Sequence, residues 1–322
     1  MGNLENARDL GQGVYTQAEV DSRDTAATYN AVQENRGFKN YIINGGFDVW
    51  QRGNGPFTGY NYGPDRWVCA NGTHNSSASS SVIGKRMNHI INTTAGGNLL
   101  YQAIELNLVG YNAPFTTGKT FTISVYYAST TKIKPSLTFR DGVVGNNPVD
   151  IFTTTEYKGG SGNNQVVSWT FAVSATALST NTCATLSIIG ESAATNCYVY
   201  NVQLEEGSVA TPFEQRPYGL ELSLCQRYYQ QYIDYSDFMF TTSNSGLCSH
   251  TVPLPVKMRV HPSIAYQDLA GNNGKFTVAG NNNISPSAGG LSNSISFAGI
   301  DVVFAAYPNS KVQFRAFLNS EL

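Results

Sequence analysis

The sequence has few charged residues and no long apolar run. Asp, Glu, Lys and Arg make up only 13% of its 322 residues, whereas about 25% is usual in globular proteins. Lys and Arg total 20, Asp and Glu total 22, and the formal net charge is -2. This balance argues against the basic surface of a nucleic-acid-binding protein. No stretch approaches the length of about 18 apolar residues that a membrane-spanning helix needs, so we expect no membrane insertion.

A secretion signal and a cysteine framework are also missing. The first residues, Met1–Asn6, contain neither a basic region nor an apolar run, which argues against a signal peptide. The five cysteines lack metal-ligand spacing. Cys183 and Cys197 flank Gly190 symmetrically, and they would face each other if Gly190 topped a hairpin. In a reducing cytosol, two small buried thiols are the favoured interpretation.

Catalytic motifs are absent as well. The chain has no His-Glu-x-x-His, Gly-x-Ser-x-Gly or phosphate-loop pattern, and its four histidines are scattered. Glu205 and Glu206 are adjacent, so on a strand they would point to opposite faces and could not flank one glycosidic bond. No internal repeat of the kind that builds a β-helix occurs. We therefore expect a protein that is not an enzyme and has no catalytic residues.

The abundant residues indicate an all-β fold. The chain has 19 Tyr, 16 Phe and 31 Gly, which suits strands joined by polar turns. Between residues 40 and 218, apolar side chains alternate with period two, as in Phe121–Tyr127 and Val167–Val173. Leu186 with Ile188, and then Tyr198, Tyr200, Val202 and Leu204, supply two further strands. This pattern predicts a jelly-roll β-sandwich.

Composition divides the chain into four parts. Residues 1–39 are polar, with a capping box at Thr16 and Glu19, and predict a short helical or extended arm that is either mobile or ordered by a partner. Residues 40–218 form the predicted sandwich. Residues 219–235 carry apolar groups at helical spacing, which predicts a linker helix of about four turns. Residues 236–322 predict a small antiparallel β-domain, whose light core would benefit from a trimeric assembly.

Segments in these parts resemble, in order, segments of one class of protein. They are similar to the opening of a β-sandwich domain, its closing strand, the helix after that strand, and the start of a C-terminal β-domain in bacteriophage tail-fibre and related virion proteins. The segments are Asn44–Gly53 with Pro64–Trp67, then Val202–Glu214, Arg216–Tyr229 and Pro255–Pro262. The resemblance covers roughly residues 40–265. More distantly, the sandwich resembles jelly-roll carbohydrate-binding modules.

This resemblance implies a structural virion protein of a tailed bacteriophage, assembled in the host cytoplasm. The expected form is a homotrimeric tail-fibre or spike subunit that attaches to host-surface polysaccharide, where multivalency would strengthen weak sugar contacts. Residues 1–39 would bind other tail or capsid proteins. The alternatives are a capsid-decoration or head-fibre protein without receptor binding, and a glycan-degrading tailspike enzyme.

The candidate ligand-binding residues of the opening segment are Trp50, Arg52, Asp65 and Trp67. Aromatic faces stack on sugar rings, and charged groups fix sugar hydroxyls. The alternative, which we favour, is a structural signature at the rim of the sandwich. Other aromatic platforms are equally plausible: Tyr60, Tyr62, Tyr126 and Tyr127.

Carbohydrate-binding relatives often hold a structural calcium ion near the opening Asn-Gly motif and an acidic residue of the closing strand. Here Tyr200 and Asn201 stand where an Asp is common. An Asn oxygen is a weaker calcium ligand than a carboxylate. We therefore expect no metal ion and no other cofactor.

Overall fold

The computed structural model describes residues 38–69, 72–78, 86–92, 97–106, 115–141, 148–175, 181–232, 239–241, 247–285, 292–296, 299–305 and 311–321. Two compact units divide the chain, residues 1–41 and residues 42–322. The expected helix that begins at Thr16 lies outside the described residues. Every described helix and strand belongs to the second unit.

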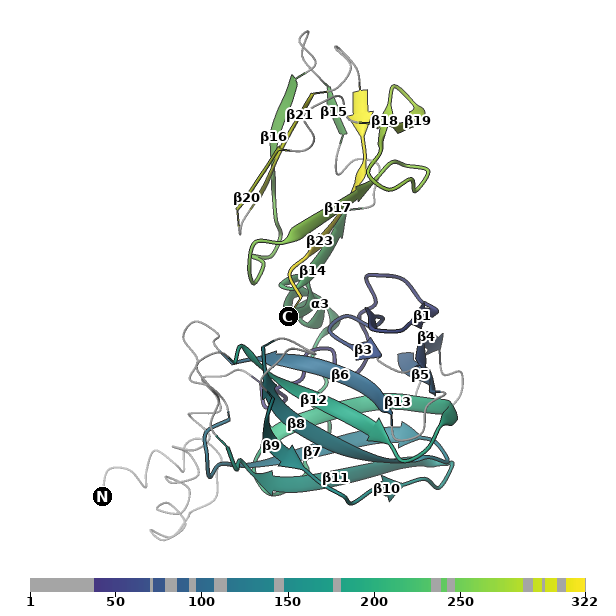
Figure 1. Cartoon of the computed structure of the whole chain (residues 1–322), viewed down its shortest axis with the longest axis vertical. Coiled ribbons are helices and arrows are strands. Elements are labelled where there is room, and N and C mark those ends of the chain that lie inside the picture. Colours follow the sequence, from purple (N-terminus) through teal and green to yellow (C-terminus); the bar gives the residue numbers. More distant parts are fainter. Residues whose placement is uncertain are drawn as a thin grey trace, which may run out of the picture. The chain divides into compact units, whose positions relative to one another are not determined.

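Two antiparallel sheets form a β-sandwich in the first part of this unit (Figure 1). In spatial order, the six-stranded sheet consists of β1 (Phe57–Thr58), β4 (Gly72–Ala78), β5 (Arg86–Asn92), β13 (Ala194–Glu206), β7 (Thr120–Ala128) and β11 (Asn164–Ala172). The seven-stranded sheet consists of β10 (Lys158–Gly159), β8 (Lys132–Arg140), β12 (Cys183–Gly190), β6 (Asn98–Glu105), β3 (Val68–Cys69) and β2 (Asn61–Tyr62), with β9 (Val149–Thr153) paired to β8. The predicted jelly-roll sandwich is thereby confirmed.

The core of the sandwich lies between the two sheets. Phe152 of β9 stacks on Phe171 of β11 with ring centroids 4.3 Å apart, which joins one sheet to the other. Phe115 packs between Phe121 of β7, at 5.1 Å, and Phe139 of β8, at 6.4 Å. The alternating apolar residues of the sequence therefore point inward, because burial of one face is what produces a period of two.

A bulge in β13 changes which side chains of this strand point toward the core. Val199 of β13 pairs with Tyr127, but Asn201 pairs with the next residue, Tyr126, so the register shifts by one residue at Tyr200. Val202 points into the core and is fully buried. Tyr198 and Tyr200 instead share the outer face with Tyr126. The bulge thus splits a run that the sequence presents as continuous.

The linker helix is shorter than predicted. Helix α3 spans Tyr218–Gln226 and comes directly after Pro217, and the chain then enters strand β14 (Tyr229–Tyr232). This strand pairs with β23 (Arg315–Asn319), which lies about ninety residues later. The prediction of a helix to residue 235 is wrong because tertiary pairing overrides local helical spacing. The buried side chains of α3 are Glu221 and Cys225.

Three small antiparallel sheets complete the described part of the chain. The first contains β14, β23 and β17 (Ser263–Gln267). The others are, in spatial order, β15 (Met239–Thr241), β22 (Lys311–Gln313), β18 (Phe276–Val278) and β19 (Asn281–Ile284), and β16 (Leu247–Pro253), β21 (Gly299–Ala305) and β20 (Ser292–Ser296). Met258, Phe276 and Leu318 are fully buried in a core to which the first two of these sheets contribute. We call this part of the chain, from β14 onward, the C-terminal sheets.

Cys183 and Cys197 do not face each other across a hairpin. Cys183 lies on β12, between β6 and β8, whereas Cys197 lies on β13 of the other sheet. Both are buried, and they form no disulfide with each other. Gly190 ends β12, but the strand after it joins the other sheet, as a jelly roll requires, so the symmetric spacing around Gly190 is misleading.

Candidate functional site

Asn44 organises the opening segment. Its backbone has φ of 55°, a left-handed conformation that Asn tolerates better than most residues. Its side-chain Oδ1 accepts a hydrogen bond from the backbone N–H of Val49 at 3.0 Å, and its Nδ2 donates to the carbonyl oxygens of Val49 and Asp65 at 2.8 and 2.9 Å. Trp67 Nε1 donates to the Asn44 carbonyl at 2.9 Å. One amide therefore ties the two opening motifs together.

The two tryptophans of the predicted site are buried. Trp67 is fully inaccessible and packs against Phe47 with ring centroids 5.2 Å apart. Trp50 is 7% exposed, and its Nε1 donates to the carbonyl of Phe47 at 2.7 Å. Stacking on a sugar needs an open ring face, and neither indole has one. Their geometry fits the structural signature that we favoured.

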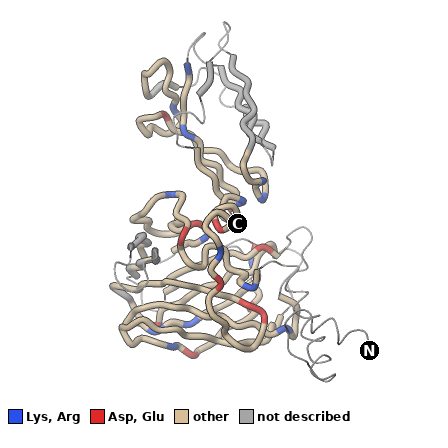
Figure 2. Tube along the Cα trace, turned by 180° about the vertical axis from the view of Figure 1, so that it is seen from behind, with Lys and Arg blue, Asp and Glu red and all other residues tan. Residues whose placement is uncertain are grey.

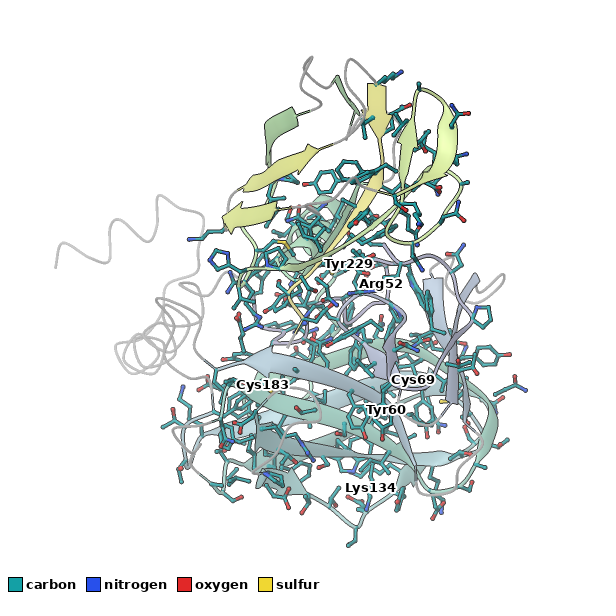
Figure 3. The ribbon with its side chains drawn as sticks, turned by 45° about the horizontal axis from the view of Figure 1, so that its top comes forward. Arg52, Tyr60, Cys69, Lys134, Cys183 and Tyr229 are labelled. Carbon is teal, nitrogen blue, oxygen red and sulfur yellow. The ribbon has the colours of Figure 1, made fainter. Side chains whose placement is uncertain are left out.

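Arg52 and Asp65 do lie together. Arg52 Nη1 is 3.6 Å from Asp65 Oδ1. The guanidinium stacks on Tyr229 at 3.7 Å from the ring centroid and lies 4.9 Å from that of Tyr62, and Figure 3 shows Arg52 beside Tyr229. The aromatic partners are tyrosines, one of them from β14.

Burial raises the pKa of Asp65 to about 6, although Arg52 and hydrogen bonds from Gln51 oppose the shift. The backbone N–H of Gln51 donates to Asp65 Oδ1 at 3.1 Å, and its side-chain amide donates to Oδ2. The same amide donates to the carbonyl of Tyr229 at 2.9 Å. Asp65 thus faces two donors and a cation that it cannot share with a ligand.

Glu321 brings the end of the C-terminal sheets into this cluster. Its carboxylate lies 3.3 Å from Arg52 Nη2 and forms an ion pair with Arg66 Nη1. Arg66 is almost completely buried, and its guanidinium stacks on Tyr228 at 3.5 Å. Its Nη2 donates to the carbonyl of Ala103 at 2.5 Å. The opening segment, β6 and the C-terminal sheets therefore meet around two arginines.

Further ion pairs extend the contact on both sides. Arg227 Nη2 lies 3.0 Å from Glu105, and Tyr228 donates to the same carboxylate at 3.1 Å. Glu221 of α3 accepts from Arg216 Nη1 at 3.2 Å and from the backbone N–H of Asn44. We call this set the charged junction: Arg52, Asp65, Arg66, Glu105, Arg216, Glu221, Arg227 and Glu321. Figure 2 shows acidic and basic positions gathered at this part of the trace. Each carboxylate of the set is paired with an arginine, so the arrangement joins parts of the chain.

The closing segment folds back over the outer face of β13. Glu205 accepts from the backbone N–H and the hydroxyl of Thr211, at 2.8 and 2.6 Å. Gln203 Oε1 accepts from the backbone N–H of Glu214 at 2.8 Å, and its Nε2 donates to Glu205 at 2.9 Å. Gln203 and Glu205 are buried. The closing motif is therefore explained by packing, because its polar residues hold the returning chain.

Beyond this cover, the outer face of the six-stranded sheet carries a group of tyrosines. Tyr126 of β7 and Tyr200 of β13 lie with ring centroids 4.9 Å apart at an interplanar angle of 32°. Tyr198 packs against the same group, with Ala128 beneath it. Tyr126 and Tyr198 are half-buried, and Tyr200 is 5% exposed. Burial raises the pKa of Tyr200, with a further contribution from Tyr126.

The neighbouring strands extend this surface. Val166 of the edge strand β11 lies directly opposite Tyr126 and is 66% exposed. Asn164 lies opposite Ala128, and Ser168 opposite Ser124. We call the whole surface the tyrosine face: Ser124, Tyr126, Ala128, Asn164, Val166, Ser168, Tyr198, Tyr200 and Asn201. An apolar and aromatic surface edged by amides and hydroxyls is the usual chemistry of a small-molecule or sugar site.

The four tyrosines that the sequence offered as further aromatic platforms lie in different environments. Tyr60 is exposed in the turn between β1 and β2, and Tyr62 lies over Arg52. Tyr127 points into the core and donates from its hydroxyl to the Lys158 carbonyl at 3.0 Å. Only Tyr126 belongs to the tyrosine face. The sequence did not reveal that Tyr198 and Tyr200 lie on the outer face, because the bulge at Tyr200 leaves no mark in the alternation.

The residues present do not fit the calcium site that the resemblance to carbohydrate-binding modules would imply. Asn44 Oδ1 already accepts a hydrogen bond from Val49, and Tyr200 and Asn201 supply no carboxylate. No group of three or more His, Cys, Asp or Glu side chains that could hold a metal ion occurs within the described ranges. No helix in the described part of the chain is long and apolar enough to cross a membrane.

No protein-family model and no curated protein matches the chain. Among solved structures, it is similar to the CBM22-1 and GH10 modules of xylanase 10B from Clostridium thermocellum, complexed with xylohexaose, at a TM-score of 0.36 and 17% identity over 54% of this chain and 30% of that one. It is similar to the enzymatically active domain of tailspike protein 4 from bacteriophage CBA120 at 0.33 and 13%, over 52% and 21%. A C-terminal family 22 carbohydrate-binding module of Clostridium thermocellum gives 0.34 and 20%, over 49% and 100%. The chain therefore spans less than a third of the first two structures.

Proposed function

We propose that the tyrosine face binds a glycan. The observation that carries the proposal is the half-exposed pair Tyr126 and Tyr198, which pack over the buried Tyr200 next to the exposed Val166. A sheet face exposed to water normally carries polar side chains, so aromatic rings and a valine there expose an apolar surface that a ligand can cover. Sugar rings offer apolar faces of that kind, and Asn164, Asn201 and Ser168 supply donors and acceptors for their hydroxyls.

We further propose that the chain is a structural virion protein of a tailed bacteriophage, a subunit of a homotrimeric tail fibre or spike. The support is the ordered resemblance of four sequence segments to virion fibre proteins. Residues 1–39 would attach it to other tail or capsid proteins, and weak glycan contacts would be strengthened by three-fold multivalency. Capsid decoration without receptor binding is the alternative.

The proposed role is not enzymatic. Glu205, the buried acid of the closing strand, has its carboxylate oxygens occupied by Thr211 and Gln203. The acids of the charged junction are paired with arginines. General acid-base cleavage of a glycosidic bond needs two carboxyl groups that flank the substrate. Incubation with polysaccharides should therefore produce no new reducing ends, whereas their appearance would support the tailspike-enzyme alternative.

Glycan binding is tested by substitution on the tyrosine face. We expect Tyr126→Ala to weaken retention in polysaccharide-containing gels by about tenfold, because a tenfold loss corresponds to about 1.4 kcal/mol and ring stacking contributes about that much. The matched control is Tyr157→Ala, which removes a half-buried tyrosine lying 4.7 Å from Lys134 on the other sheet. Equal behaviour of the two variants would contradict the proposal.

The virion role is tested separately. Antibody labelling of intact particles should place the chain on a projection from the tail, and capsid-lattice labelling would favour decoration instead. The solution mass of the purified protein should be three times the mass of one chain. A monodisperse monomer would count against the fibre assignment and would leave the glycan test unaffected.

A further inference from the structure

The tyrosine face is uncharged throughout its described side chains. On β11 and β7 it presents Asn164, Val166, Ser168, Ser124 and Tyr126, and on β13 it presents Tyr198, Tyr200 and Asn201. Its polar groups are therefore amides and hydroxyls, which donate to and accept from neutral partners.

Two charged side chains beside this face, Glu205 and Lys158, have partners among the described residues. Glu205, on the same face of β13, is buried under Thr211 and accepts its two hydrogen bonds. At the sheet edge, Lys158 Nζ donates to the carbonyl of Ser168 at 2.8 Å and lies 3.3 Å from Glu156. Lys158 is thus held by a backbone oxygen and a carboxylate.

We propose that the ligand of the tyrosine face is a neutral glycan, a polymer of uncharged sugars, and not an acidic polysaccharide. This inference rests on the proposed function and names its substrate class. Covering a carboxylate without a matching cation carries a desolvation cost that none of the described side chains of this face offsets. Surfaces that recognise acidic polymers concentrate Lys and Arg, which also raise the association rate. Hydroxyl groups need only the amides, serines and tyrosines that are present.

Affinity electrophoresis of the full chain provides the first test. The gels contain a neutral polymer, either dextran or galactomannan, or an acidic one, either alginate or polygalacturonate. We expect retardation by a neutral polymer that persists from about 50 to about 500 mM NaCl, because binding without charge pairs is not screened by salt. This retardation should be lost in Tyr126→Ala and kept in Tyr157→Ala.

A pair of charge insertions provides the second test. Val166 is exposed and lies opposite Tyr126, so Val166→Lys and Val166→Glu place opposite charges beside the bound sugar with little risk to the fold. A neutral ligand should respond to both variants alike, within about twofold. An acidic ligand would bind the Lys variant and the Glu variant with affinities that differ by roughly tenfold at low salt, since a unit charge acts at this range.

The outcomes distinguish glycan binding itself from the neutrality of the glycan. Retention by acidic polymers alone, or a roughly tenfold split between the Val166 variants, would overturn neutrality and leave glycan binding in place. Retention by none of the polymers would overturn glycan binding, and neutrality with it. A change of oligomeric mass in Tyr126→Ala without a change in retention would make the face a subunit contact and overturn both.

Discussion

At the scale of single residues, the role of Asn44 in the opening motif is to hold the backbone through hydrogen bonds. Asn44 has one side chain with both a donor and an acceptor, and it uses both on the backbone of Val49. An aspartate there would lack the donor, and an alanine would leave buried backbone groups unpaired. The value of Asn44 is therefore geometric, which explains why it resembled a binding motif without being free to bind.

Asp65 gives a prediction about pH. Its pKa of about 6 in the folded protein lies above the ordinary 3.8, so the folded state binds the proton more tightly than the unfolded chain. The contribution of this group to the free energy of unfolding therefore falls as pH rises from about 4 to 6, and the loss is complete above that range. The groups that face it are Arg52, Gln51 and Glu321.

Asp65→Asn removes this titration. Relative to the wild type, the variant should gain about 3 kcal/mol between about pH 4 and pH 7, because one pKa unit corresponds to about 1.4 kcal/mol. Urea unfolding across that range measures the difference. Any constant offset from altered hydrogen bonds is the same at every pH, so two parallel stability curves would contradict the assignment.

At the scale of elements, the sandwich could be predicted because period-two alternation reports directly on which face is buried. The strands through Phe121–Tyr127 and Leu137–Phe139 obey that rule. Two features could not be read from the sequence, and both depend on distant partners. The bulge at Tyr200 exists only relative to β7, and the end of α3 is set by pairing of Tyr229–Tyr232 with β23.

The candidate site was predictable to the same limited extent. Arg52 and Asp65 are neighbours, as the sequence suggested, but their setting is a buried contact whose other members come from Glu321 and Tyr229. Residues so far apart in sequence share no local pattern. Only part of the tyrosine face was predicted. Tyr126 was named as a candidate, whereas Tyr198 and Tyr200 were assigned to a strand without a prediction of which side of the sheet they occupy.

Helix α3 offers a test of how the sandwich is anchored at its C-terminal end. Glu221→Ala should lower the free energy of unfolding by about 3 kcal/mol, because it leaves the buried Arg216 without its nearest carboxylate. The matched control is Glu156→Ala, which breaks an exposed ion pair with Lys158 and should cost less than about 1 kcal/mol. Chemical denaturation measures both variants, and similar costs would show that the helix is not anchored through Glu221.

At the scale of the whole second unit, the charged junction couples the sandwich to the C-terminal sheets. Buried ion pairs contribute little net stability against apolar packing, but breaking one side of them is costly. The junction therefore contributes more to the cooperativity of unfolding between the sandwich and the C-terminal sheets than to the stability of either part. We expect residues 42–322 to unfold in one cooperative transition.

Glu321→Ala should separate that transition into two. Without this carboxylate, Arg66 loses its ion pair inside the protein, and the C-terminal sheets should melt below the sandwich. Differential scanning calorimetry measures the split. Glu191→Ala, which removes the exposed ion pair with Lys132, should leave the single transition unchanged. One unaltered transition in Glu321→Ala would mean that the coupling lies elsewhere.

The ion pair between Arg66 and Glu321 also sets an order of events during synthesis. Its partners are 255 residues apart, so the sandwich emerges from the ribosome long before the carboxylate that its arginines need. A nascent chain that ends before Glu321 would lack the carboxylate that pairs with Arg52 and Arg66 in the complete protein. Proteases and chaperones could thereby distinguish an interrupted polypeptide from a finished one.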